Sequence, residues 1–126
     1  MGLDQYAYTG KRRETNDETD YVEIAYWRKH NRLEGFMKEL WIEKGRPGAS
    51  KEYPNEFNCI MIELTPEDID RLLRDTVNDA LPETQGFFFG SDSQISCHKK
   101  DDTLRFISRA RDAFTAGLKV FYSSNW

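Results

Sequence analysis

The chain of 126 residues contains only two cysteines and two histidines, so little of it suits metal or thiol chemistry. Cys59 and Cys97 lie far apart, and with His30 and His98 they show no paired spacing of the kind that binds zinc. Cys97 and His98 are neighbours, and in a strand they would point to opposite faces, where they cannot share a proton. We therefore expect free thiols, no bound metal, no cofactor and no thiol nucleophile.

The sequence also lacks a long apolar run and a strong excess of charge. No stretch approaches the length that spans a membrane, and residues 1–4 lead into structured-looking sequence without a basic region and an apolar segment. The formal charge of -4 comes from 22 acidic and 18 basic side chains that are mixed along the chain, which argues against a dedicated polyanion binder. We expect a cytoplasmic protein without membrane contact, and the charge disfavours nucleic acid as a partner.

Aromatic residues, by contrast, are abundant. Eight Phe, six Tyr and three Trp make each buried residue large. Residues 84–91 place three adjacent phenylalanines between two glycines, and we expect these rings to be buried. A chain of this length hides roughly two thirds of its unfolded surface and needs no disulfide to fold. Residues 1–126 are therefore expected to form a single domain.

Two strands are expected near the start of the chain. Residues 3–8 alternate apolar and polar side chains, and Gly10 ends this pattern. Residues 11–20 are almost all polar or charged, which is typical of an exposed loop. Residues 21–27 are β-branched and aromatic, which favours a second strand paired with the first. A helix that continues into the next segment is the alternative.

A first helix is expected from Asn31, where apolar residues recur at spacings of three and four, and a start as early as Trp27 is the alternative. Asn31 and Glu34 resemble the two members of a capping box. Gly45 ends the helix, and residues 45–56 are interpreted as an exposed loop. Residues 57–64 form a near-continuous apolar run, which predicts a strand buried on both faces, with Cys59 in the core.

The second half of the chain predicts two more helices and a strand. Thr65 followed by Pro66 is a helix-start signal, and the helix it opens is expected to bury a face that extends to Val77 and Ala80. A third helix is expected from residue 101 or 102 up to Gly117, with a strand at 118–122. The predicted fold class is α+β, with a single small sheet, mixed or antiparallel, and about three helices packed on it.

Three segments are candidates for a binding site. Residues 26–32 place aromatic rings beside cations that suit a base or a phosphate, although a plain strand-to-helix junction explains the same pattern. Asp4 is a lone acid in an apolar strand, and it either shares a proton with Glu23 or pairs with Arg28; we favour the ion pair. Residues 85–91 offer backbone amides to an anion, although a buried strand fits their rings better. The candidate ligand-binding residues are Asp4, Tyr26, Trp27, Arg28, His30, Gln85 and Ser91.

Four separated blocks carry a resemblance to a known group of proteins. They are MGLD at residues 1–4, EIAYWRKHN at 23–31, TQGFFFG at 84–90 and FYSSNW at 121–126. Together they resemble a group of small proteins encoded by bacteriophages and prophages, for which no activity is established. In that group the final Trp directly follows the serines, whereas here Asn125 intervenes. The resemblance implies a phage origin and the host cytoplasm, and it assigns no catalytic residue.

These observations favour a protein that acts by binding rather than by catalysis. We expect a small phage accessory protein that binds a host or phage protein through its aromatic residues, and a homodimer is compatible with this function. The alternative is a small-ligand binder or enzyme, with nucleotides among the candidate ligands, whose pocket brings together Asp4, residues 26–28 and residues 85–91. The two functions differ in whether these side chains converge on a concave pocket.

Overall fold

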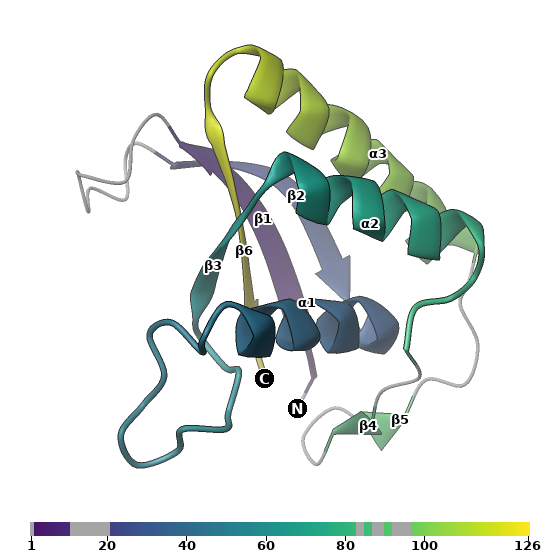
Figure 1. Cartoon of the computed structure of the whole chain (residues 1–126). Coiled ribbons are helices and arrows are strands. Elements are labelled where there is room, and N and C mark those ends of the chain that lie inside the picture. The colour runs from purple at the N-terminus through teal and green to yellow at the C-terminus, as the bar shows by residue number, and fades with distance from the viewer. Residues whose placement is uncertain (1, 11–20, 83–84, 87–89, 92–96) are drawn as a thin grey trace.

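The described part of the chain forms one four-stranded antiparallel sheet and three helices, with a separate two-stranded hairpin (Figure 1). The computed structural model describes residues 2–10, 21–82, 85–86, 90–91 and 97–126. The elements are β1 (Asp4–Gly10), β2 (Tyr21–Arg28), α1 (Asn31–Glu43), β3 (Met61–Leu64), α2 (Pro66–Val77), β4 (Gln85–Gly86), β5 (Gly90–Ser91), α3 (Cys97–Thr115) and β6 (Lys119–Asn125). The predicted α+β class is confirmed, and the sheet is antiparallel.

The strand order of the sheet is β2-β1-β6-β3, so the last strand of the chain lies between the first and the third. The predicted pairing of the first two strands is confirmed, with Asp4 opposite Arg28 and Gly10 opposite Tyr21. Across β6, Asp4 lies opposite Asn125. β2 and β3 are consequently the two edges of the sheet.

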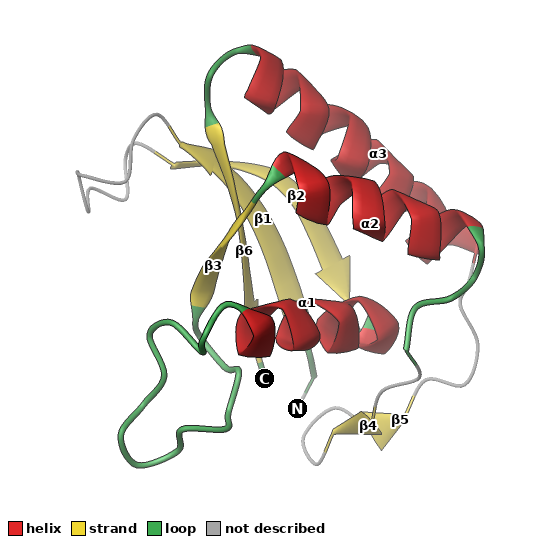
Figure 2. Ribbon diagram, viewed as in Figure 1, coloured by secondary structure: helices red, strands yellow, loops and turns green. Residues whose placement is uncertain are grey.

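All three helices cover the same face of the sheet (Figure 2). Side chains alternate between the faces of a strand, so every second residue of the sheet enters the core. Trp27 of β2 packs edge-on against Phe106 of α3, with 5.2 Å between ring centroids. The sheet contributes Ala7, Trp27, Ile62, Leu64, Val120 and Tyr122 to the core, and the helices contribute Leu33, Phe36, Met37, Leu40, Trp41, Ile69, Leu72, Phe106, Ile107, Ala110 and Ala113.

The start of α2 follows the sequence prediction. Thr65 is the N-cap and Pro66 occupies the first turn, where a missing N–H costs nothing. Asp68 completes a capping box, because its carboxylate accepts from the Thr65 amide at 2.9 Å while its own amide donates to the Thr65 hydroxyl at 3.2 Å. The helix ends earlier than expected. Val77 is its last residue and is exposed, as is Ala80.

The predicted capping box at the start of α1 is wrong. The N-cap is His30, and its side chain makes no capping hydrogen bond to the helix. Glu34 does not turn back toward Asn31; its side chain enters the interior and bonds to β6. Asn31 and Glu34 have the spacing of a capping box, but the hydroxyls of Tyr122 and Ser124 on β6 bind the Glu34 carboxylate instead.

The strand expected over 57–64 is shorter, and only its last four residues pair as β3. Cys59 has a φ of 57°, and its amide donates to the carbonyl of Ser124 at 2.8 Å. The Trp126 side chain donates to the Phe57 carbonyl at 3.0 Å. The chain therefore turns at Cys59, whose thiol is exposed and not in the core as predicted. Met61 is 42% exposed, so β3 is buried on one face only.

α3 begins at Cys97, several residues before the predicted start. The expectation that Cys97 and His98 lie in a strand is therefore wrong. Lys99 and Lys100 fix the first turns, because Lys99 donates to the Lys29 carbonyl at 2.7 Å and Lys100 pairs with Asp79 at 3.1 Å. These tertiary contacts extend the helix toward its N-terminus, so that it begins before Asp101 and Asp102, the two acids that suggested its start in the sequence.

Several predictions concern segments between these elements. The predicted loop at 11–20 and the rings of residues 87–89 lie outside the described residues. The connection at 45–56 is irregular and mostly exposed. In the β4–β5 hairpin Gln85 pairs with Ser91. Within the part of the chain that the structure describes, no helix combines the length and apolarity needed to cross a bilayer.

Candidate functional site

The face of the sheet turned away from the helices carries a row of aromatic side chains and one methionine, which we name the tyrosine face. Register places Tyr6 opposite Tyr26 on β2 and opposite Ser123 on β6. Tyr8 lies opposite Phe121. In Figure 1 no described helix covers this face. The tyrosine face comprises Tyr6, Tyr8, Tyr21, Tyr26, Met61 and Phe121.

The rings of the tyrosine face are fixed by contacts with one another. Tyr6 stacks on Tyr8 with 6.2 Å between ring centroids and lies tilted against Tyr26 at 5.3 Å. Tyr21 meets Phe121 edge-on at 5.3 Å. Tyr26 keeps 45% of its surface exposed, whereas Phe121 keeps 4%. Rings held in this way lose little further conformational freedom when another surface covers them.

Charged residues border the tyrosine face in opposite-sign pairs. The Tyr26 hydroxyl donates to Asp4 at 2.7 Å, and Arg28 lies 3.5 Å from the same carboxylate. The hydrogen bond to Asp4 raises the pKa of Tyr26 above its usual value. Lys119 pairs with Glu63 at 3.8 Å. The predicted ion pair between Asp4 and Arg28 is confirmed.

The candidate residues from the sequence divide into three groups. Asp4, Tyr26 and Arg28 meet at one end of the tyrosine face. Trp27 alternates to the other face, is 2% exposed and donates to the Thr103 hydroxyl at 3.2 Å. His30 is 1% exposed at the start of α1.

Gln85 and Ser91 are described only as paired backbone, and their side chains lie outside the described residues. Glu23 lies opposite Tyr8, away from Asp4, so these two acids do not form the alternative proton-sharing pair. The convergent part of the predicted site is therefore an exposed cluster of one tyrosine, one acid and one arginine.

A buried polar cluster between α1 and the sheet escaped the sequence analysis. The Glu34 carboxylate accepts from the Ser124 hydroxyl at 2.8 Å and from the Tyr122 hydroxyl at 3.2 Å. Gln5 donates its amide to the Tyr122 hydroxyl at 3.0 Å and to the His30 carbonyl at 2.9 Å. The Gln5 side-chain oxygen accepts from the His30 amide at 2.9 Å. The cluster thereby joins β1, β6 and the first turn of α1.

Burial dominates the electrostatics of this cluster. It raises the pKa of Glu34 to about 7, against the opposing effect of the hydrogen bonds from Ser124 and Tyr122. Burial, with the nearby Glu34, also raises the pKa of Tyr122 well above its usual value. Glu34 is 3% exposed, so the cluster lies beneath the surface, and its hydrogen bonds tie the start of α1 to β1 and β6.

A signal for the buried cluster was present in the sequence. Glu34 falls between Leu33 and Met37 on the apolar face of its helix, and Gln5 alternates with Leu3 and Ala7 on the buried face of its strand. Polar residues at inward positions are informative because each needs a buried partner. The periodicity of the sequence therefore identifies polar residues at buried positions, although it does not reveal which of them bond to each other.

The described residues also define what chemistry is accessible. Among them, no group of three His, Cys, Asp or Glu side chains is arranged to hold a metal ion. A pocket of about 220 Å³ lies beside Cys59, between the 45–56 connection and the segment that leads into β3. The Cys59 thiol lies 3.5 Å from the amide oxygens of Asn58 and Asn125, which are not bases that could activate it.

A scan against models of protein families, a search of curated proteins and a search of solved structures each gave no match. The resemblance to small phage-encoded proteins therefore stays a prediction. The tyrosine face and its border are the observations from which function can be inferred.

Proposed function

We propose that this protein is a small phage accessory protein that binds a host or phage protein through its tyrosine face. The observation that carries the proposal is the pre-arranged row of partly exposed rings on the sheet face that no described helix covers. Large, rigid aromatic side chains provide much of the binding energy of protein interfaces. The host cytoplasm is the proposed location, in keeping with the phage-like sequence blocks.

The charges around the tyrosine face favour a protein partner over a nucleic acid. Asp4, Glu23 and Glu63 outnumber Arg28 and Lys119 on this face. Nucleic-acid affinity grows with the number of phosphates that cations neutralise, and here the two cations already pair with acids. A partner that presents an apolar centre with a mixed polar border complements this surface.

The test compares partner capture by matched variants from infected host cells. Replacing Tyr6 and Tyr8 together with serine removes two rings from the centre of the face. Replacing Tyr53 with serine removes a ring that is 58% exposed in the 45–56 connection, away from the sheet. We expect mass spectrometry to find the partner with the wild type and with the Tyr53→Ser variant but not with the double variant. Circular dichroism checks that each variant is folded.

Self-association is measured alongside, because two tyrosine faces can also cover each other. Sedimentation of the purified wild type and the double variant separates the outcomes: a dimer that becomes a monomer when Tyr6 and Tyr8 are replaced indicates that the partner is a second copy. Equal capture by all three proteins, with no change in mass, would contradict the proposal.

The second candidate function is binding of a small ligand by Asp4, Tyr26 and Arg28. The observation that favours it is that these three candidate residues meet: the Tyr26 hydroxyl and the Arg28 guanidinium both lie within 3.5 Å of the Asp4 carboxylate. Native mass spectrometry of the protein from infected cells would then show an added small molecule, and the Asp4→Asn variant would lose it. A protein partner retained by Asp4→Asn but lost by the double tyrosine variant favours the first function.

A further inference from the structure

β2 is an edge strand whose outer side pairs with no other strand in the described part of the chain. The Lys29 amide donates to the Leu3 carbonyl at 2.8 Å, which fixes the hydrogen-bonding register with β1. Bonded and non-bonded pairs alternate along an antiparallel ladder, so the backbone groups of Tyr26 and Arg28 point away from β1. The second half of β2 therefore presents N–H and C=O groups to a fifth strand.

The first half of the same edge is protected. The register with β1 shifts between Ala7 and Tyr8, which leaves Ile24 as an extra residue in β2. Arg109 of α3 donates to the Ile24 carbonyl at 2.7 Å and so occupies an acceptor that another strand would use. No comparable contact to the Tyr26 or Arg28 backbone occurs among the described residues. The open part of the edge thus begins just after Ile24.

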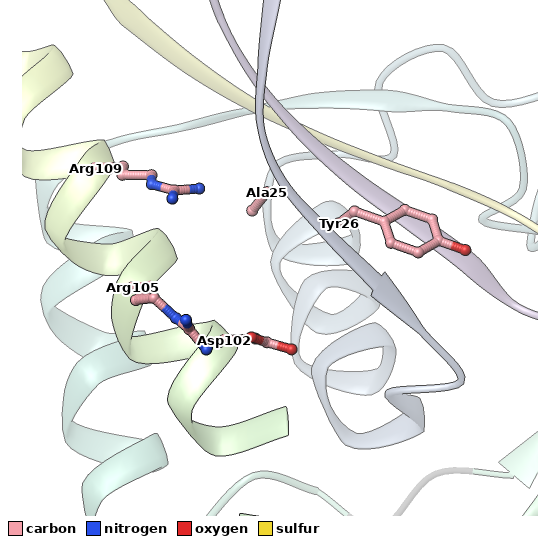
Figure 3. A pocket seen from close by; sticks show the side chains of 5 residues that line it. All are labelled: Ala25, Tyr26, Asp102, Arg105 and Arg109. Carbon is pink, nitrogen blue, oxygen red and sulfur yellow. Dashed lines mark hydrogen bonds and ion pairs between the residues drawn. The ribbon is translucent and has the colours of Figure 1, made fainter. Parts of the chain in front are cut away.

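A pocket of about 140 Å³ lies beside this open edge, between β2 and α3 (Figure 3). Arg105 and Arg109 extend from α3 toward β2, while the Tyr26 ring lies on the far side of the strand. Arg105 bonds to Asp102 at 2.8 Å through one nitrogen and keeps 65% of its side chain exposed. A guanidinium has five N–H donors, so both arginines retain donors that face the pocket.

We propose that the groove between the β2 edge and α3 binds an extended acidic peptide segment of a protein partner. The segment pairs with β2 as a fifth strand and places carboxylates against Arg105 and Arg109. Addition of a strand to an open edge is a common mode of peptide recognition, in which backbone bonds give affinity and flanking side chains give specificity. The groove shares Tyr26 with the tyrosine face, but it uses the backbone edge of β2 and the arginines of α3, whereas the tyrosine face is tested at Tyr6 and Tyr8, so either proposal can fail without the other.

Two other occupants fit the groove less well. A nucleic acid can supply phosphates to the arginines, but it has no alternating amide N–H and C=O groups to pair with the edge of β2. A second copy that paired through β2 would bring its own α3 to the groove, so its Arg105 and Arg109 would approach the same two arginines of the first copy, and like charges at close range repel. Charge complementarity therefore selects an acidic strand.

The probe is a capped hexapeptide of alternating valine and glutamate with a fluorescent label, measured by fluorescence polarisation with the full chain. One control peptide has glutamine in place of every glutamate. A second control carries N-methyl groups on alternate residues, which blocks strand pairing and leaves the charges unchanged. We expect binding of the acidic peptide at about 50 mM salt, weaker binding at about 300 mM, and no binding of either control.

Protein variants locate the site. Replacing Arg105 and Arg109 together with glutamine should weaken binding about a hundredfold, because each charged contact contributes on the order of a tenfold change in affinity. Arg111→Gln is the matched control, since Arg111 lies on the same helix, is half exposed and pairs instead with Asp70. The single variant Arg105→Gln keeps the hydrogen bond from Arg109 to the Ile24 carbonyl. It should lose part of the affinity for the peptide.

Three results would overturn the inference. They are no binding of the acidic peptide at about 1 mM, equal binding of the N-methylated peptide, and an equal loss of affinity in the Arg111→Gln variant. Nuclear magnetic resonance should show shifts of the amides of residues 25–28 upon binding. The double variant of Tyr6 and Tyr8 should bind the peptide like the wild type, which separates this test from that of the tyrosine face.

Discussion

Replacing Glu34 with glutamine should stabilise the protein at pH 8. Glu34 is buried between α1 and β6, and its two described hydrogen-bond partners are the neutral hydroxyls of Tyr122 and Ser124. Ionised Glu34 thus has hydrogen bonds but no charged partner at contact distance, and burial raises its pKa from 4.5 to about 7. Glutamine keeps the shape of the side chain and removes the charge.

The sign and size of the effect follow from proton linkage. The folded protein holds the Glu34 proton more tightly than the unfolded chain, so the contribution of Glu34 to stability is greatest below pH 4.5, falls as the pH rises to about 7 and is constant above that. A shift of this size corresponds to about 3 kcal/mol at pH 8. The amide of glutamine forfeits about 1 kcal/mol of hydrogen bonding to the two hydroxyls, which leaves a net gain of about 2 kcal/mol.

The assay is urea unfolding followed by tryptophan fluorescence at several pH values between 5 and 8. The free energy of unfolding of the wild type should fall across this range by about 2.5 kcal/mol more than that of the Glu34→Gln variant, because a small part of the loss has already occurred at pH 5. Glu39→Gln on the exposed side of α1 is the control, and it should follow the wild type within about 0.5 kcal/mol at every pH. A parallel pH dependence of the wild type and Glu34→Gln would refute the reasoning.

Three further predictions concern stability. Thr65→Ala removes half of the capping box of α2 and should lower the free energy of unfolding by about 1 kcal/mol in urea titrations, whereas no change would mean that Asp68 alone caps the helix. Trp27→Phe loses the hydrogen bond to Thr103 and core volume, and calorimetry should show a loss of about 2 kcal/mol. Deleting Trp126 removes the bonds that hold residues 57 and 58, so hydrogen exchange at Cys59 should accelerate while exchange in α2 stays the same.

Local chemistry was predictable from the sequence where neighbours along the chain decide the outcome. Thr65 and Pro66 act on the backbone within one turn, and the strands at Asp4 and Tyr21 follow from their residue pattern. The capping prediction at Asn31 failed because the competing partners of Glu34 are more than 80 residues away in the chain. No local pattern reports on contacts at such separation.

The candidate site was predictable only in part for the same reason. Tyr26, Trp27 and Arg28 looked like one cluster, yet alternation along a strand sends Trp27 into the core and the other two to the tyrosine face. The pairing of Asp4 with Arg28 was expected from their opposite charges. The groove beside α3 was not foreseen, because it depends on which strand forms the edge of the sheet.

The central place of β6 has a consequence for how the chain reaches its final form. β1 and β2 can close as a hairpin early in synthesis, but the other side of β1 stays unpaired until residues 119–125 leave the ribosome. Strand partners that are separated by most of the chain length make folding slow. Until β6 is made, the unpaired edge of β1 can bind other chains. Production of this protein should therefore be most vulnerable to aggregation when translation stalls just before its final strand.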